Sequence, residues 1–246
     1  MLSIIIPAYN EEKNIVKTIK DLLNDLDKIN RDYEVVVVCD GCKDKTYAKA
    51  KTIKNKRVVV LEYHPNRGKG YALTYGANKS SGDVVTFFDA GGDFDALHID
   101  RFAKLMEVFD ADIVIGSKRH PASQINYPLL RKIYSKFYQL LIRLLFNLNI
   151  RDTQTGLKVF KREVLNKILP RAVVKRYAFD LELLVIAKSL GYTRIFEAPV
   201  KMEFNTNGSG INFKSIYYMI ADTFGIFYRK NFLKYYNKPH KIIRKG

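Results

Sequence analysis

The chain has 246 residues, of which 42 are Lys or Arg and 25 are Asp or Glu, so its formal net charge is +17. With 47% hydrophobic and 13% aromatic residues, it is too apolar for a disordered basic protein and can bury a large core. The charge predicts an acidic partner: phosphate groups, nucleic acid or an anionic membrane. Cys39 and Cys42 are too few for a disulfide framework or a closed four-ligand zinc site, and they indicate reduced thiols in a cytosolic protein.

The N-terminal segment, residues 1–7, predicts a strand rather than a signal peptide, because no basic stretch precedes its short apolar run. No window reaches the ~18 uncharged apolar residues of a membrane span. The nearest, residues 133–150, is interrupted by Lys136 and Arg143. We therefore expect no transmembrane segment.

Short β-branched runs alternate with amphipathic stretches in the first half, which predicts a mostly parallel sheet with helices on both faces. Strands are expected near residues 2–6, 34–39, 58–62, 83–88 and 112–116, and helices over 12–29 and 69–79. Ligands of parallel sheets bind at the carboxyl ends of the strands. Polar residues directly after each strand are therefore candidates for the site.

The second half is more aromatic and more basic. A long helix is expected over 129–149, whose wide apolar face suits either the core or a membrane interface. A short strand at 157–160 and a helix at 180–190 follow. From residue 205 onward Asp222 is the only acid, and aromatic residues alternate with Lys and Arg.

Asp89 and Asp93 follow the very apolar run at 84–88. Two carboxylates at the mouth of a buried strand suit a hard divalent cation that is shared with a diphosphate, although an ordinary Asp/Gly turn has the same pattern. Asp40, after the strand at 34–39, offers a carboxylate to a ribose or a base, or begins a common turn.

Two further groups suit phosphate. Lys69 lies in a glycine-rich segment, 66–70, that opens a helix, where free backbone N–H groups could also meet phosphate. Arg131 and Ser135 are one helical turn apart and so share a face, which is either a phosphate grip or a solvated surface.

Taken in chain order, these motifs resemble the nucleotide-sugar domain of the family 2 glycosyltransferases, which have the GT-A fold. The first half contributes Ile4-Ile-Ile-Pro7-Ala-Tyr9-Asn10-Glu11-Glu12, the Asp40-Gly41 turn, Asn66-x-Gly68-Lys69-Gly70 and the strand that ends in Asp89. The second half looks like the polyprenyl-phosphate branch, above all the dolichyl-phosphate β-glucosyltransferases and next the dolichyl-phosphate mannosyltransferases. Its motifs are Gly116-Ser117-Lys118-Arg119, the Arg131/Ser135 pair, Arg151 to Phe160 and Tyr177 to Leu184.

The resemblance implies transfer of a hexose from a nucleotide sugar to an isoprenoid phosphate, with inversion at the anomeric carbon. UDP-glucose is the favoured donor and GDP-mannose the alternative. Four residues would hold the nucleoside, namely Pro7, Tyr9, Glu11 and Asp40. Asp89 and Asp93 would bind Mg²⁺ or Mn²⁺ at the leaving diphosphate.

For the acceptor, the resemblance implies that Lys118, Arg131 and Ser135 hold its phosphate. Such a phosphate is largely ionised at neutral pH, so a strong general base is less necessary than for a sugar hydroxyl. Asp180 aligns with the usual base position of the family, and a helix N-cap is the alternative role for this residue.

Three positions depart from the family pattern. Gly91 replaces the second aspartate of the metal motif, which leaves an impaired nucleotide-sugar binding module as an alternative function. Cys39 replaces an acid before Asp40, which bears on the choice between UDP and GDP. The loop 204–210 lacks the charged residues that relatives carry there.

We expect residues 1–204 to form the GT-A domain and residues 205–246 a basic, aromatic, amphipathic tail. Residues 133–149 and 213–236 are predicted to lie against the cytosolic face of a membrane, with the protein cytoplasmic and peripheral. Nucleic acid is not expected as a partner, because charge alone supports it and no nucleic-acid-reading motif is present.

Overall fold

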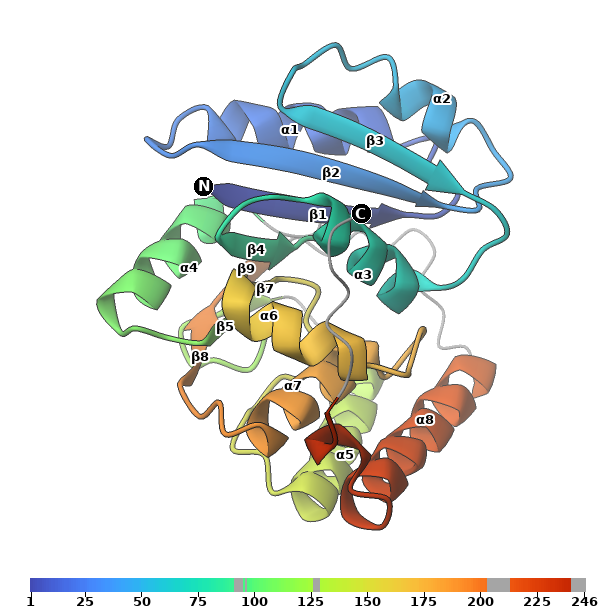
Figure 1. Ribbon diagram of the computed structural model, residues 1–246, viewed down its shortest axis with the longest axis vertical. Helices are drawn as coiled ribbons and strands as arrows, with labels where there is room; N and C mark the ends of the chain where they lie inside the picture. The colour runs from blue at the N-terminus through green and yellow to red at the C-terminus, as the bar shows by residue number, and fades with distance from the viewer. Residues whose placement is uncertain (91–94, 96, 126–128, 203–212, 240–246) are drawn as a thin grey trace.

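The apolar segments of the chain pair into a seven-stranded sheet with the order β3-β2-β1-β4-β7-β5-β8 (Figure 1). The computed structural model describes residues 1–90, 95, 97–125, 129–202 and 213–239. Only β7 runs antiparallel to its neighbours in this sheet, between β4 and β5. The strands are β1 (Leu2–Ala8), β2 (Tyr33–Asp40), β3 (Val58–Tyr63), β4 (Val84–Phe87), β5 (Ile113–Ser117), β7 (Lys158–Lys161) and β8 (Ile195–Pro199).

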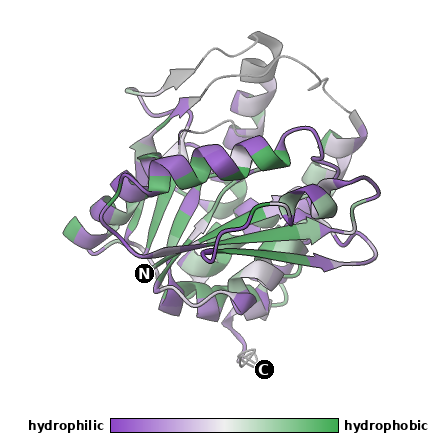
Figure 2. Cartoon of the chain, turned by 90° about the horizontal axis from the view of Figure 1, so that it is seen from above, coloured by the Kyte–Doolittle hydropathy of each residue, from purple (hydrophilic) through white to green (hydrophobic). Residues whose placement is uncertain are grey.

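Helices cover both faces of this sheet, because alternate side chains of each strand enter different apolar clusters. Ile4 and Ile6 of β1 pack with the helices α1 and α4, whereas Ile5 between them packs with α3 and α7. Figure 2 shows the apolar strands enclosed by helices whose outer surfaces are polar. The helices are α1 (Ile15–Leu26), α2 (Thr46–Ala50), α3 (Lys69–Lys79), α4 (Leu97–Val108), α5 (Leu129–Phe146), α6 (Arg162–Ile168), α7 (Phe179–Ser189) and α8 (Phe213–Asn231), with 3₁₀ turns η1 (Leu169–Arg171) and η2 (Tyr235–Asn237).

The fold class and the main elements predicted from the sequence are confirmed. The helix expected from residue 12 begins at Ile15, because residues before it form a turn in which the N–H of Asn14 donates to the carbonyl of Glu11. A second, two-stranded parallel sheet joins β6 (Gln124–Ile125) to β9 (Lys201–Met202). The predicted boundary between residues 204 and 205 falls outside the described residues.

The C-terminal helices pack together beside α7 at the end of the molecule away from β3 (Figure 1). Tyr138 of α5 shares a 2.8 Å hydrogen bond with Thr223 of α8, and Phe146 meets Phe227 edge to face. Ile226 and Tyr236 are fully buried in the same core as α7. Residues 213–237 are therefore built into the fold around α7.

Within the described residues, no helix is long and apolar enough to cross a membrane.

Candidate active site

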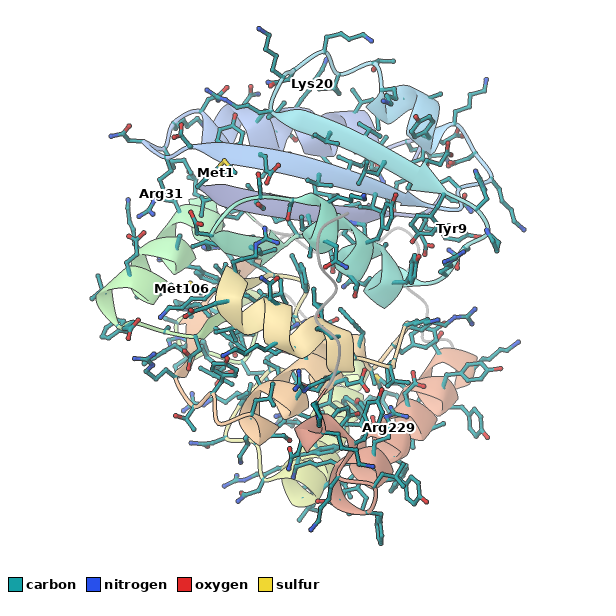
Figure 3. All side chains as sticks on the ribbon, in the orientation of Figure 1. Met1, Tyr9, Lys20, Arg31, Met106 and Arg229 are labelled. Atoms are coloured by element: carbon teal, nitrogen blue, oxygen red, sulfur yellow. The ribbon has the colours of Figure 1, made fainter. Side chains whose placement is uncertain are left out.

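A cleft of about 640 Å³ opens where β1, β2 and β4 end. This is the edge at which a parallel sheet presents its loops to a ligand. Tyr9, just after β1, marks this edge in Figure 3. The cleft is lined by most of the residues expected to bind the donor, together with several others: Pro7, Ala8, Tyr9, Glu11, Asp40, Asn66, Gly68, Lys69, Asp89, Ala90, Gln154, Arg176, Tyr177 and Asp180.

The segment after β1 is shaped to present side chains to the cleft. Asn10 has a left-handed backbone (φ 56°), which turns the chain sharply after Tyr9. The backbone N–H of Glu11 donates to Thr46 Oγ1 at 2.7 Å, and Asn10 Oδ1 accepts from the N–H of Lys43. Tyr9 is 44% exposed, so its ring is available to stack on a flat group.

Asp40 organises the neighbouring turn. Its Oδ1 accepts from Tyr63 Oη and the N–H of Arg67, and its Oδ2 accepts from Asn66 Nδ2 and the N–H of Gly68. A carboxylate has about four acceptor sites, and the protein uses all of them. Asp40 therefore shapes this part of the cleft by holding the turn at 66–68. A direct contact between its carboxylate and a nucleoside stays a prediction.

The turn needs glycine at position 68. Gly68 has φ 93°, and a Cβ there would lie 2.5 Å from the carbonyl oxygen of Lys175. Its conformation directs the chain into α3, whose first residue is Lys69. The side chain of Lys69 thereby reaches the cleft.

Charges alternate along the floor of the cleft. Lys69 Nζ lies 2.7 Å from Asp89 Oδ1 and 3.7 Å from Asp180 Oδ2. Lys158 Nζ lies 2.6 Å from Asp180 Oδ1 and also donates to the carbonyl of Thr155. The lysine side chain at 158 is completely buried, so its ammonium depends on these partners for compensation.

Asp180 lies in the first turn of α7, and its environment favours the ionised form. Burial alone would raise its pKa, but the ammonium groups of Lys158 and Lys69 hold the pKa of Asp180 below its usual value. A carboxylate so stabilised is a weak base. The N-cap of α7 is Ala178, so the N-cap role considered for Asp180 is wrong.

The loop 151–156 packs against Asp89 and contributes to the lining of the cleft. Gly156 packs so tightly on Asp89 that a Cβ at this position would lie 1.9 Å from Asp89 Oδ2. Gln154 lines the cleft, and its buried Nε2 has no hydrogen-bond partner within the protein. An unpaired buried donor at a cleft wall suits a polar group of a bound ligand.

Lys118 and Ser135, two of the residues expected to hold an acceptor phosphate, do not belong to the cleft lining. Lys118, after β5, pairs with Asp152 at 3.6 Å, and its backbone N–H donates to Asp152 Oδ2. Arg119 donates to Ser135 Oγ of α5 at 2.6 Å, which brings a further guanidinium to this helix. Arg131 lies one turn earlier on α5, and its side chain is outside the described residues, as is all of Asp93.

A divalent cation fits this site if it arrives together with a diphosphate. No group of three or more His, Cys, Asp or Glu side chains in the described parts of the chain forms a metal site. Asp89, 35% exposed, nevertheless presents oxygen atoms to the cleft. Mg²⁺ in proteins is commonly held by one or two carboxylates plus substrate phosphates, so Asp89 would be the protein ligand.

Arg176 and Lys158 were missed as site residues from the sequence. Arg176 carries no motif of its own, because it reaches the cleft only through the packing of the loop before α7. Lys158 did carry a signal: a lysine between Leu157 and Val159 interrupts an apolar strand, and a buried charge requires a partner.

Glycosyl transferase family 2 matches residues 3–169 of the chain. A dolichyl-phosphate beta-glucosyltransferase of Trichomonas vaginalis is 35% identical over 97% of this chain and 77% of its own length. A dolichyl-phosphate beta-glucosyltransferase of Drosophila melanogaster is 36% identical over 77% of this chain, which spans 63% of that relative.

Among solved structures, glucosyl-3-phosphoglycerate synthase from Mycobacterium tuberculosis, in complex with Mn²⁺, UDP and phosphoglyceric acid, has a similar fold. Its TM-score is 0.71 at 19% identity, over 98% of this chain and 80% of that one. The family match and the relatives agree with the cleft and its motifs. The chain belongs to glycosyl transferase family 2.

Proposed function

We propose that this enzyme transfers glucose from UDP-glucose to the phosphate of a dolichyl or polyprenyl phosphate, with inversion at the anomeric carbon. The proposal rests on a direct link between the cleft and an exposed aromatic helix. Tyr177 lines the cleft, and its hydroxyl accepts a 3.1 Å hydrogen bond from Ser215 in the first turn of α8. An acceptor with a charged head and a long apolar chain suits this arrangement.

The donor binds along the ends of β1 and β4. Tyr9 and Glu11 contact the nucleoside, while Lys69 and Arg176 neutralise the diphosphate as the bond to the sugar breaks and its electron pair moves to the leaving group. The relatives named above support glucose, and the UDP complex of the structural neighbour supports uridine.

Asp89 would hold Mg²⁺ or Mn²⁺, which when bound neutralises charge on the leaving diphosphate. The Mn²⁺ in the complex of the structural neighbour supports such an ion without deciding between the two.

The acceptor phosphate approaches from the α5 side, where Lys118 and Arg119 follow β5 and Arg119 donates to Ser135 of α5. Arg131 lies one helical turn before Ser135. Its second pKa is about 6, so an ionised oxygen is available as the nucleophile at neutral pH. Asp180, paired with two lysines, therefore fixes Lys69 rather than removing a proton.

We also propose that the enzyme is peripheral on the cytosolic face of a membrane, with α5 and α8 as the contact surface. Large apolar side chains lie at helical spacing on the outside of both helices: Phe137, Leu140 and Leu144 on α5, and Tyr217, Phe224 and Tyr228 on α8, followed by Phe232. Leu144 is 75% exposed. Exposed Lys136 and Arg143 beside them suit anionic lipid.

Transfer is tested by incubating the protein with radiolabelled UDP-glucose or GDP-mannose, Mg²⁺ or Mn²⁺, and either a short polyprenyl phosphate or 3-phosphoglycerate as the acceptor. Label from UDP-glucose should enter the lipid, and Asp89→Ala should lose this activity. Transfer to 3-phosphoglycerate alone, or from GDP-mannose alone, would contradict the substrate assignment. Absence of transfer with every donor would favour an impaired binding module.

Membrane contact is tested by vesicle flotation. We expect binding to vesicles with anionic lipid, and weaker binding after Leu144→Ser. Val108→Ser is the matched control, because Val108 is 76% exposed but lies at the end of α4. Equal flotation of the two variants, or no flotation of the unsubstituted protein, would contradict the assigned surface.

A further inference from the structure

Lys69 is shared unequally between two carboxylates that differ in burial. Its ammonium is 2.7 Å from Asp89 and 3.7 Å from Asp180. The side chains of Lys69 and Asp89 are 34% and 35% exposed, whereas that of Asp180 is 8% exposed. The ammonium of Lys69 therefore lies between a partly exposed carboxylate and a buried one.

Asp180 is fixed by a partner that cannot leave. Lys158 is completely buried, and its ammonium donates to Asp180 Oδ1 and to the carbonyl of Thr155. Withdrawing either member of this pair would leave an unpaired charge in the interior. Asp180 therefore offers Oδ2 to Lys69 as a constant anionic contact.

The position of Lys69 on Asp89 conflicts with binding of a divalent cation there. A cation on Asp89 would lie within a few ångströms of an ammonium, and like charges at that separation repel. The conflict disappears if Lys69 leaves Asp89 while it keeps Asp180. A diphosphate in the cleft, beside Arg176, is the anion that would receive the released ammonium.

We propose that Lys69 is an exchangeable cation of the donor site. It neutralises Asp89 in the free enzyme and turns onto the diphosphate when the donor and its divalent cation arrive together, with Asp180 as the fixed pivot. This proposal rests on the donor site proposed above and deepens it. It implies that the free enzyme binds the cation weakly and that the nucleotide strengthens this binding.

The experiment measures binding of Mn²⁺ to the full chain by electron paramagnetic resonance, without nucleotide and with saturating UDP. Lys69→Met keeps the apolar stem and removes the competing charge. We expect it to bind Mn²⁺ about five-fold more tightly without nucleotide, as removal of a partly exposed ion pair allows. UDP should strengthen Mn²⁺ binding less in this variant: the ratio of the Mn²⁺ affinity with UDP to that without UDP should be about ten-fold smaller than in the unsubstituted enzyme.

The matched control is Lys79→Met, which removes an exposed lysine at the other end of α3 and should leave both Mn²⁺ affinities unchanged. Lys69→Arg, which keeps the charge, should retain weak Mn²⁺ binding without nucleotide. Thermal unfolding checks that each variant is folded, and Lys69→Gln replaces the methionine variant if that one is not.

Unchanged or weaker Mn²⁺ binding by folded Lys69→Met without nucleotide would overturn the exchange. The measurement needs no turnover, so it is separate from the test of the proposed function. If the variant binds Mn²⁺ more tightly but the unsubstituted protein transfers no sugar, the exchange at Asp89 is upheld. Only the proposed transfer reaction is then rejected.

Discussion

Gly156→Ala is the substitution for which the structure gives the sharpest expectation. The added Cβ would lie 1.9 Å from Asp89 Oδ2 and 2.4 Å from its Cγ, whereas ordinary contacts begin at 3.4 Å. The Asp89 carboxylate must therefore move by about 1.5 Å from its place in the cleft, which also disturbs its contact with Lys69. A misplacement of about 1 Å at a reacting centre can cost on the order of 100-fold in rate.

We therefore expect kcat/KM for UDP-glucose to fall about 100-fold, equivalent to about 2.7 kcal/mol of transition-state stabilisation. The assay is initial-rate transfer to a short polyprenyl phosphate, with circular dichroism to check folding. Gly225→Ala is the control, because Gly225 does not line the cleft and the nearest atom to its added Cβ would be Arg229 Nη1, at 3.3 Å. A rate for Gly156→Ala within about three-fold of the unsubstituted enzyme would refute this view of the Asp89 contact.

Two further predictions concern stability. Glu182 is fully buried and accepts hydrogen bonds from the N–H groups of Val173 and Val174, from Arg229 and from Tyr236 Oη. Glu182→Ala should therefore lower the free energy of unfolding, measured in urea, by about 3 to 5 kcal/mol. A loss below about 1 kcal/mol would contradict this expectation. Burial lowers the pKa of His98 below 6.5, and its Nε2 accepts from the N–H of Lys201. As the pH falls, the imidazole of His98 is therefore protonated in the unfolded chain before it is protonated in the folded one. The free energy of unfolding should decrease from about pH 7.5 to about pH 5.5, and His98→Phe should reduce this dependence on pH.

The sheet could be predicted from the sequence because each of its first five strands is a compact β-branched run. The helix at 69–79 was predicted with its observed bounds, since glycine precedes it and apolar residues recur at helical spacing. The short helices α2 and α6 have five and seven residues, too few for a clear periodicity, and they were not predicted.

The site was predicted best where residues directly follow strands, as Tyr9 and Asp89 do, because the topology of a parallel sheet brings those positions together. The sequence could not tell that Asp40 uses its carboxylate to hold a turn. It also could not tell that Lys158 and Lys69 share Asp180, because these pairings join three separate elements. Such side-chain choices depend on tertiary packing rather than on local pattern.

Two acidic side chains in the first turn of α7 contact different parts of the molecule. Asp180 points to the floor of the cleft, while Glu182, two residues later, is held by Arg229 of α8 and by Tyr236 of η2. A truncation before α8 would therefore strip a buried carboxylate of its partners within the same helical turn that anchors Lys69. Shortening the polypeptide from its carboxyl end would therefore disturb the proposed donor site together with the proposed membrane surface, so the test of membrane contact requires point substitutions on the outer surface of α8 rather than deletions.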